Sequence, residues 1–480
     1  MKKVLLIIFL LIHATTHAQV APYNWETRAL YYANEDIIGS ARSVGVGGGF
    51  GILGADFSSA KYNPAGIGMY QFNELSISPS FHNNTATSYF NNKNEDQKMG
   101  VGISNFGLVW SGVSNNKKWK RINLAIGWNQ FANYNRSVYI DGYQNKTSLV
   151  NNLIKNSNGL TVDELGIAEL LAWETYLIDN PVSNTTYTPN IITSTNKRTI
   201  RQVESSGYRG ELNFSLATSY KEKIYIGATI GIPNINYYRF NTHVEKEFSE
   251  TMTATILDTL GSINEFTYKD ELSIYGYGLN LKLGIIGRLN KRVKLGLALH
   301  SPSIYSMRRL FNTEITTNIT SSAYTTPVFE YQMLSPWKTI ISAGGNITKR
   351  ILINIDYELI DYSFSKFNFK NFPEQENNIN QNIKDTYTRA QNLRVGGEIR
   401  LKFISFRAGY ALFGNPYVSK NENYSKENFT YGLGITNGNF SIDGAYVLSK
   451  NSSEYEMYNE AVSPIVETNH NFVVTARFKY

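Results

Sequence analysis

The sequence predicts an all-β protein: a transmembrane antiparallel β-barrel of about 14 strands whose lumen is plugged by an N-terminal hatch. Three observations support this fold class. Segments with a period of two residues recur from Glu74 to the end of the chain, short and long connections between them take turns, and no segment after the extreme N-terminus approaches the roughly 20 apolar residues of a membrane-spanning helix. The chain would therefore cross a membrane as strands.

The composition supports one large unit without subdivision. The chain has 480 residues, no cysteine and no Pro-rich or Ser-rich linker, and its 33 tyrosines and 25 phenylalanines suit the aromatic girdles of a barrel. The formal net charge is +7, and it falls to +5 when Lys2 and Lys3 are removed with the N-terminal segment described next. So mild an excess indicates no nucleic-acid partner.

The first 18 residues are typical of a secretory signal peptide. Lys2 and Lys3 precede an apolar run from Val4 to Ile12, and the small-x-small ending Thr16-His17-Ala18 allows cleavage before Gln19. We therefore expect residues 1–18 to be removed during export and the mature protein to reside in the cell outer membrane.

We interpret residues 19–72, between the expected signal peptide and the barrel that begins at residue 73, as the hatch, because their central stretch follows neither a helical nor a strand period. The central stretch, Gly54 to Met69, comes after a glycine run and holds Asp56 and the triplet Asn63-Pro64-Ala65. Small residues let a segment fold tightly inside a tube, Pro64 fixes a bend, and Asn63 can bond locally to backbone. The hatch and gate residues expected from this stretch are Asp56, Asn63, Pro64 and Ala65. The alternative is a Gly-rich surface loop.

The clearest strands alternate apolar and polar residues over lengths greater than the five or six usual in soluble sandwiches. In Ile351 to Leu359 the odd positions are apolar or aromatic, whereas three of the four even positions carry Asn, Asp or Glu. In Leu393 to Phe403 one face is largely apolar and the other carries arginine, glutamate and lysine. The last strand runs to Tyr480, and we expect it to pair with the first strand because an open edge in lipid is costly.

The connections supply the second argument. Short ones such as Asn437-Gly438-Asn439 alternate with long polar segments such as 135–205, the plan of an outer-membrane barrel with tight periplasmic turns and large external loops. Within 135–205, Thr161-Val162-Asp163-Glu164 matches a capping box and is followed by apolar residues at helical spacing. We expect a short external helix there, ending before Pro181 and packed on neighbouring loops.

No enzyme signature is found. The glycine run 45–51 does not follow a strand and open a helix, the histidines His82, His243, His300 and His470 lack metal-ligand spacing, and no Gly-x-Ser-x-Gly motif occurs. Inward acidic residues such as Asp356, Glu358 and Glu398 fit the mixed charges of a barrel lumen. The expectation is a protein that is not an enzyme and binds no metal or cofactor.

These features together resemble the FadL family of outer-membrane transporters for long-chain fatty acids and other hydrophobic compounds. The resemblance rests on the signal peptide, the Gly-rich segment leading into Asp56 to Ile67, and later stretches in the barrel: His300-Ser301-Pro302, Ile355-Asp356-Tyr357-Glu358, Leu393 to Glu398, and Phe406 to Tyr410. It implies a 14-stranded barrel with a hatch, from which ligands leave sideways through a wall gap at a kinked strand, without an energy source.

The expected function is thus passive transport of hydrophobic small molecules, long-chain fatty acids by default, with outer-membrane lipid as the surroundings. Arg308 and Arg309 are candidates for binding a ligand carboxylate, because arginine offers paired donors; alternatively they face water at the rim. A second hypothesis is a barrel of the same family that binds proteins as a subunit of a secretion system. A third, weaker one is a surface structural or adhesive protein.

Overall fold

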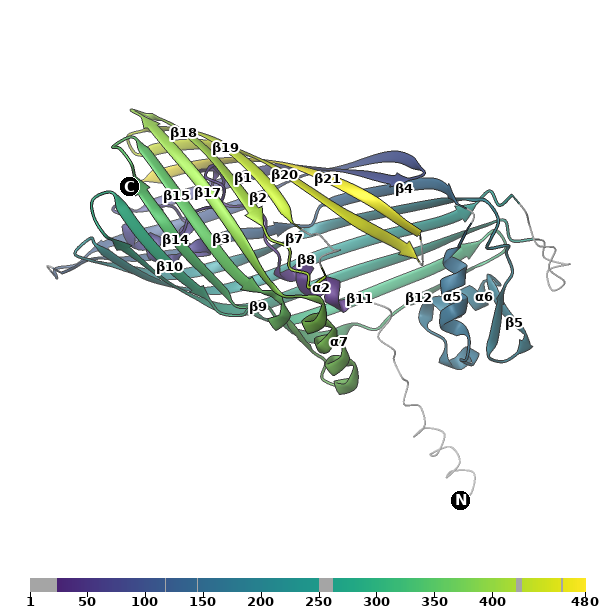
Figure 1. Cartoon of the computed structure of the whole chain (residues 1–480). Helices are drawn as coiled ribbons and strands as arrows, with labels where there is room; N and C mark the ends of the chain where they lie inside the picture. Colours follow the sequence, from purple (N-terminus) through teal and green to yellow (C-terminus); the bar gives the residue numbers. More distant parts are fainter. Residues whose placement is uncertain (1–23, 117, 145, 250–261, 420–424, 459–460) are drawn as a thin grey trace, which may run out of the picture.

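The structure is a computed structural model of the chain, and it describes residues 24–116, 118–144, 146–249, 262–419, 425–458 and 461–480. The expected signal peptide lies outside the described residues. None of the helices in these ranges is long and apolar enough to cross a membrane. Most of the described chain is strand, and the strands run nearly the full length of the molecule (Figure 1).

The wall is a closed antiparallel β-barrel of 14 strands, four of which are interrupted and carry two labels. β1 pairs with β21 from Glu74↔Lys479 to Ser88↔Ile465, so the first and last strands close the barrel as the sequence predicts. In order around the wall the strands are β1 (Glu74–Phe90), β2 (Asn92–Val113), β3 (Trp119–Asn133) with β4 (Arg136–Gln144), β7 (Lys197–Tyr220), β8 (Ile224–Lys246), β9 (Glu265–Arg288), β10 (Val293–His300) with β11 (Ile304–Thr317), β14 (Lys338–Asn346) with β13 (Phe329–Leu334), β15 (Ile351–Asp361) with β16 (Lys366–Asn368), β17 (Arg389–Leu401), β18 (Ile404–Phe413), β19 (Lys426–Asn437), β20 (Phe440–Tyr458) and β21 (Ala461–Lys479).

Apolar side chains cover the outside of this wall. In β10, for example, Leu295, Leu297 and Leu299 are exposed whereas Ala298 and His300 point inward and are buried. Because alternate residues of a strand face opposite sides, the period of two seen in the sequence separates a lipid-facing set from a lumen-facing set. An even number of strands, an apolar exterior and short turns at one end are the features of an outer-membrane β-barrel.

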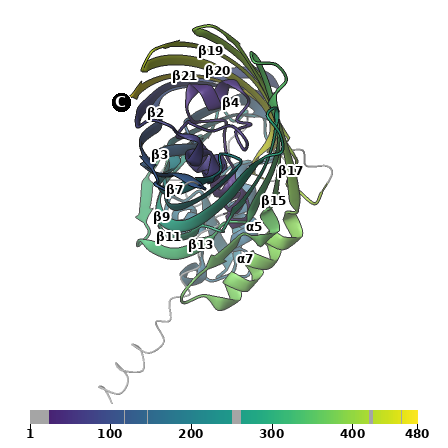
Figure 2. The same cartoon turned by 90° about the vertical axis from the view of Figure 1, so that its left-hand side faces the viewer.

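The N-terminal segment, residues 24–72, lies inside the barrel, and we keep the name hatch for it. Figure 2 shows it as the purple ribbon within the ring of strands. Its elements are short: α2 (Trp25–Ala33), α3 (Ala41–Gly45), α4 (Ser59–Tyr62) and the 3-10 helix η1 (Pro64–Met69). Nearly every residue from Ile37 to Gly68 is buried, so the expected filling of the lumen by this segment is present.

The hatch touches the wall backbone to backbone, because glycines remove the side chains from the contact. On one side, a Cβ added to Gly409 of β18 would lie 2.3 Å from Gly47 N, and one on Gly396 of β17 would lie 2.3 Å from Val46 O. Gly47 itself has φ +71°, a conformation that favours glycine. On the opposite side a Cβ on Gly227 of β8 would lie 2.3 Å from Pro64 O.

The end of the barrel with long loops carries most of the other helices. The expected helix is present as η2 (Val162–Glu164) followed by α6 (Ile167–Glu174), which packs against β11 and the short strand β12 (Ser321–Thr325). α5 (Leu149–Ser157) and the hairpin β5 (Ile178–Ser183) with β6 (Thr186–Pro189) complete this cap. Another loop forms α7 (Pro373–Thr386), next to the 3-10 turn η3 (Tyr362–Phe364). The sequence did not predict α5 or α7.

Filling the glycine contact should detach the hatch while leaving the wall intact. Gly409→Val places methyl groups where Gly47 now lies, so the hatch of this variant should become sensitive to protease although the barrel still shifts its mobility on heating in gels. Gly444→Val is the matched control, because nothing lies within 4 Å of a Cβ there. Equal protease resistance of the two variants would contradict the contact.

Candidate functional site

The triplet expected to gate the barrel sits against the wall formed by β8, β9 and β10. Asn63 caps η1, since its Oδ1 accepts a hydrogen bond from Ala65 N at 3.1 Å, and its Nδ2 donates to Gly51 O at 2.8 Å. The amide fits because Gly284 of β9 has no side chain; a Cβ there would lie 2.0 Å from Asn63 Oδ1. Pro64 starts η1, where its missing N–H costs nothing.

Asp56 lies apart from this contact, in the middle of the hatch. Its carboxylate accepts hydrogen bonds from Ser40 Oγ at 2.8 Å and from Ser58 N at 2.9 Å. Ser40 is itself the N-cap of α3. Asp56 therefore ties two hatch segments together, whereas Asn63, Pro64 and Ala65 meet the wall.

The wall itself is interrupted between β2 and β3. β2 pairs with β1 from Asn92 to Val109, but its pairing with β3 runs only from Val113↔Arg121 to Asn105↔Asn129. Residues 92–104 of β2 consequently have strand partners on one side alone. β3 ends at Asn133 and continues, after Tyr134 and Asn135, as β4, which pairs with β7 instead. We call this interruption the seam.

At the seam β4 lies underneath the β1–β2 hairpin. Ser88, which faces inward on β1, donates to Tyr139 O of β4, and Asn94 Nδ2 of β2 donates to Asp141 O at 2.9 Å. Ser137 Oγ of β4 reaches Asp96 Oδ2 of β2 at 2.6 Å. The overlap is thus held by side chains and not by a backbone ladder, so it can open without breaking a ladder.

The hatch grips β3 just before the seam. Asp36 N donates to Phe131 O at 2.8 Å, and Asp36 Oδ2 accepts from Asn133 N at 3.0 Å. Phe131 is the extra residue of a bulge, because the β3–β7 register shifts between Gln130 and Ala132. Lys61 Nζ adds a bond to Gln130 O at 3.4 Å. Position of the hatch and conformation of β3 at the seam are therefore coupled.

Lys61 is a fully buried cation that carboxylates do not contact directly. Its ammonium donates to Ile38 O at 3.1 Å and lies 4.6 Å from the centroid of the Phe131 ring. In the described part of the chain it forms no ion pair, although Glu35 is close enough to act on it. Burial lowers the pKa of Lys61 to about 7; Glu35 opposes this shift, and Lys338 and Arg394 add to it.

A cavity of about 170 Å³ lies in the lumen against the inner side of the seam. It is bounded by the hatch, by the β3–β4 junction and by β1, β20 and β21. The charged residues of its lining are paired: Asp36 with Lys426 at 2.5 Å, and Arg136 with Glu467. The lining also contains apolar side chains and many amides, including Ile37, Ile38, Ala132, Val447, Asn84, Asn135, Asn469 and Asn471.

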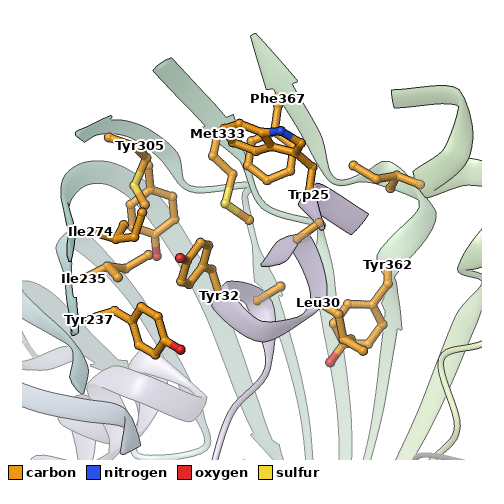
Figure 3. Close-up of a cluster of buried hydrophobic side chains, with 14 of the residues drawn as sticks. Trp25, Leu30, Tyr32, Ile235, Tyr237, Ile274, Tyr305, Met333, Tyr362 and Phe367 are labelled. Carbon is orange, nitrogen blue, oxygen red and sulfur yellow. The ribbon is translucent and has the colours of Figure 1, made fainter. Parts of the chain in front are cut away.

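The opposite side of the lumen is filled. Trp25 of α2 is 3% exposed and makes edge contacts with Tyr331, Phe367 and Phe369, the ring centroids lying 4.7–5.0 Å apart. Figure 3 shows α2 surrounded by side chains from the β8–β13 wall. A cavity of about 40 Å³ remains on this side beside Ser301, Ser303 and Pro336, and it is smaller than the cavity beside the seam.

Arg308 and Arg309 do not act as a pair. Arg308 is 71% exposed on the outer face of β11, where its Nε lies 3.0 Å from Glu330 Oε1. Arg309 faces the lumen, is 4% exposed and covers the rings of Trp25 and Phe329 at 5.6 and 5.4 Å. Neighbouring strand residues face opposite sides, so one carboxylate cannot contact both.

A second irregularity of the wall keeps its bonding. Ser301-Pro302-Ser303 separates β10 from β11 opposite Ser335-Pro336, which separates β14 from β13. Across this pair of prolines, Ser335 N donates to Ser303 O at 3.0 Å and Ser303 N to Ser335 Oγ at 2.8 Å. Of the two irregularities, the seam is therefore the one at which the longer stretch of strand lacks backbone pairing.

Comparison with known proteins rests on structure alone, since no protein-family model and no curated protein sequence matches the chain. The P. putida toluene transporter TodX superposes with a TM-score of 0.54 over 94% of this chain and 99% of its own, at 11% identity. A Pseudomonas aeruginosa FadL homologue gives 0.55 over 93% and 99%, at 12% identity. The chain has the FadL fold. The CymD monoaromatic hydrocarbon channel agrees, with a TM-score of 0.51 over 94% and 98% at 11% identity.

The FadL fold confirms the resemblance expected from the sequence, at the level of architecture. The site residues that sequence reasoning missed are Lys61, Asp36 and the bulge at Phe131. Lys61 lies within the stretch Asp56 to Ile67. A charged residue among small ones in a segment expected to be buried could have marked it as a candidate. The sequence signal for the seam was weaker: residues 91–98, where β2 begins, are strongly polar.

Raising the pH should tighten the hatch. Because the pKa of Lys61 is about 7 in the folded protein and ordinarily 10.5, unfolding or release of the hatch takes up a proton between these values, and stability rises with pH there. Hydrogen exchange of hatch amides, corrected for its intrinsic rate, should slow between pH 7 and 9 by up to about tenfold per pH unit. Lys61→Met should remove this dependence; an unchanged slope in that variant would assign it to another group.

Proposed function

We propose that the protein is a passive channel for hydrophobic small molecules, gated by the hatch and emptied sideways through the seam into the membrane. The observation that carries this proposal is the position of the cavity: it adjoins the hatch on one side and, on the other, the β3–β4 junction at which the chain leaves its pairing with β2. A molecule in the cavity is thus one wall layer away from lipid.

The surroundings of the seam favour apolar cargo. Outside it, Met99, Val101 and Ile103 of β2 are 60%, 81% and 50% exposed and form an apolar path into the bilayer. Polar nutrients would gain nothing from such an exit. Proteins with the same fold are described as toluene transporters and a monoaromatic hydrocarbon channel, which supports the same class of cargo here.

Long-chain fatty acids are our proposed cargo within that class. Lys61 is a buried cation held by carbonyl oxygens and aromatic rings, so a carboxylate that reached it would supply the missing counter-charge. The comparisons lend no support to the secretion-subunit alternative.

Binding and release would be coupled through the hatch. A carboxylate that draws Lys61 away from Ile38 O and Gln130 O also loosens the backbone bond between Asp36 and Phe131, because these contacts share one turn of the hatch. The β3 bulge would then be free to move, and the side-chain contacts across the seam could part. No energy source is needed, since cargo moves down its gradient.

Closing the seam covalently should stop transport. The chain has no cysteine, so Asp96→Cys with Ser137→Cys, at side chains 2.6 Å apart, gives one engineered disulfide across the seam. The oxidised variant should take up oleate at least about tenfold more slowly than the reduced one, as expected when the main path is blocked.

The matched control is Ser215→Cys with Thr229→Cys, whose hydroxyls are 2.7 Å apart on the fully paired strands β7 and β8. Its oxidation should leave uptake unchanged. If both disulfides slow uptake equally, or neither does, the seam is not the exit.

Removing the gate triplet should alter uptake without unfolding the barrel. Deletion of Asn63 to Ala65 takes away the bond to Gly51 O and the contact with Gly227 and Gly284, while leaving every barrel strand complete. We expect oleate uptake to change and the heat-dependent gel shift to remain. Unchanged uptake by a folded barrel would remove the gate role of this triplet.

A further inference from the structure

The outer surface of the barrel carries an apolar groove far from the seam. It has a volume of about 650 Å³ and crosses β3, β7, β8, β9 and β10. Of its thirteen lining residues only Thr218 and Trp119 have a polar side-chain atom. The groove forms because the outward positions Thr218 and Ala228 are small, whereas their neighbours Leu216, Ile226 and Leu283 are large and exposed.

Only one backbone layer separates this groove from the hatch. Gly227 and Gly284 line the groove from the wall, and on their inner side a Cβ would meet Pro64 O at 2.3 Å and Asn63 Oδ1 at 2.0 Å. The gate triplet and the groove are therefore the two faces of the same stretch of wall.

The turns below the groove form a strongly basic rim. The turns between β2 and β3, β7 and β8, and β9 and β10, together with the strand residues next to them, carry seven exposed cations among the described residues: Lys118, Lys120, Lys221, Lys223, Arg288, Lys291 and Arg292. Their one acidic residue, Glu222, is paired with Lys120 at 3.3 Å. The surplus of positive charge at this corner is not balanced by the protein.

Groove and rim are close enough to hold one molecule. Thr218 precedes Lys221 by three residues, and Ile226 follows Lys223 by three, a distance of about 10 Å along a strand. Aromatic rings lie between them, because Trp119 packs edge-on against Tyr220 at 5.1 Å. Such rings mark the level of lipid headgroups.

We propose that this corner binds an anionic phospholipid of the leaflet on the short-turn side, with an acyl chain in the groove and the phosphate on the basic rim. The site lies outside the proposed cargo path and does not depend on the proposed function. Apolar lining alone would give no preference over bulk lipid, because lipid tails are as apolar as leucine; the preference comes from the clustered lysines and arginines.

Charge also decides against a second copy of the chain as the occupant. Two copies in one membrane have their short turns at the same level, so pairing through this groove would bring two basic rims together. The positive charges of the two rims would then repel each other. An anionic headgroup is complementary to the rim, and a zwitterionic one is not.

The test is retention of lipid by the full chain in mass spectrometry of the intact protein, after exchange into nanodiscs of equal phosphatidylglycerol and phosphatidylcholine. We expect one phosphatidylglycerol to be retained about tenfold more often than phosphatidylcholine, as several basic contacts imply. Lys221→Asn with Lys223→Ser and Lys291→Ser should abolish the preference. Equal retention of both lipids by the unchanged chain, or a dimer without lipid, would overturn the proposal.

Two matched controls separate this site from a diffuse charge effect. Lys349→Ser, Arg350→Ser and Lys402→Asn remove three exposed cations from other short turns, and Lys402, like Lys221, has φ near +55°. This variant should keep the preference; its loss would overturn the proposal. Ala228→Leu fills the groove and should reduce retention, whereas the outward Ala343→Leu on β14 should not. Equal effects of the two leucines would also count against the site.

Discussion

The constraint on which the structure depends is the direct contact of hatch backbone with wall backbone. A lumen of this size would normally be filled by interlocking side chains, whose packing resists movement. Here Gly396 and Gly409 on one wall, and Gly227 and Gly284 on the other, remove the side chains and admit the hatch main chain. The hatch main chain is held to the wall by hydrogen bonds, such as those from Gly51 N to the Asp356 carboxylate at 2.8 Å and from Ala41 N to Thr475 Oγ1 at 2.7 Å. Such a plug can be tight and still be displaced.

At the seam, too, few hydrogen bonds hold the neighbouring segments together. A barrel in lipid must pair its backbone groups, yet residues 92–104 of β2 pair on one side alone. The overlap with β4 compensates with side-chain bonds from Ser88, Asn94 and Ser137. Because the hatch grips β3 through Asp36 immediately before this place, the interior plug and the interrupted wall form one mechanical unit.

Much of the fold could be predicted from the sequence, because strand alternation is a local pattern and an apolar exterior makes it strong. The strand number, the closure of β1 on β21 and the helix after the capping box at 161–164 were all expected. α7 was not, since its four asparagines are poor helix formers and only Ile383 is buried. Arg308 and Arg309 show the limit for sites: adjacent strand residues face opposite sides, but which of the two arginines faces the lumen depends on strand register.

Closure by the first and last strands also sets the order of assembly. β1 begins at Glu74 and its partner β21 ends at Lys479, so the contact that completes the cylinder joins residues about as distant in sequence as the fold allows. Such contacts form late, because a long loop must be ordered first. The hatch is synthesised before every strand, and its bonding partners are spread from β1 to β21. The hatch therefore cannot complete its contacts with the wall until β21 is in place, so the barrel closes around a segment that was synthesised first.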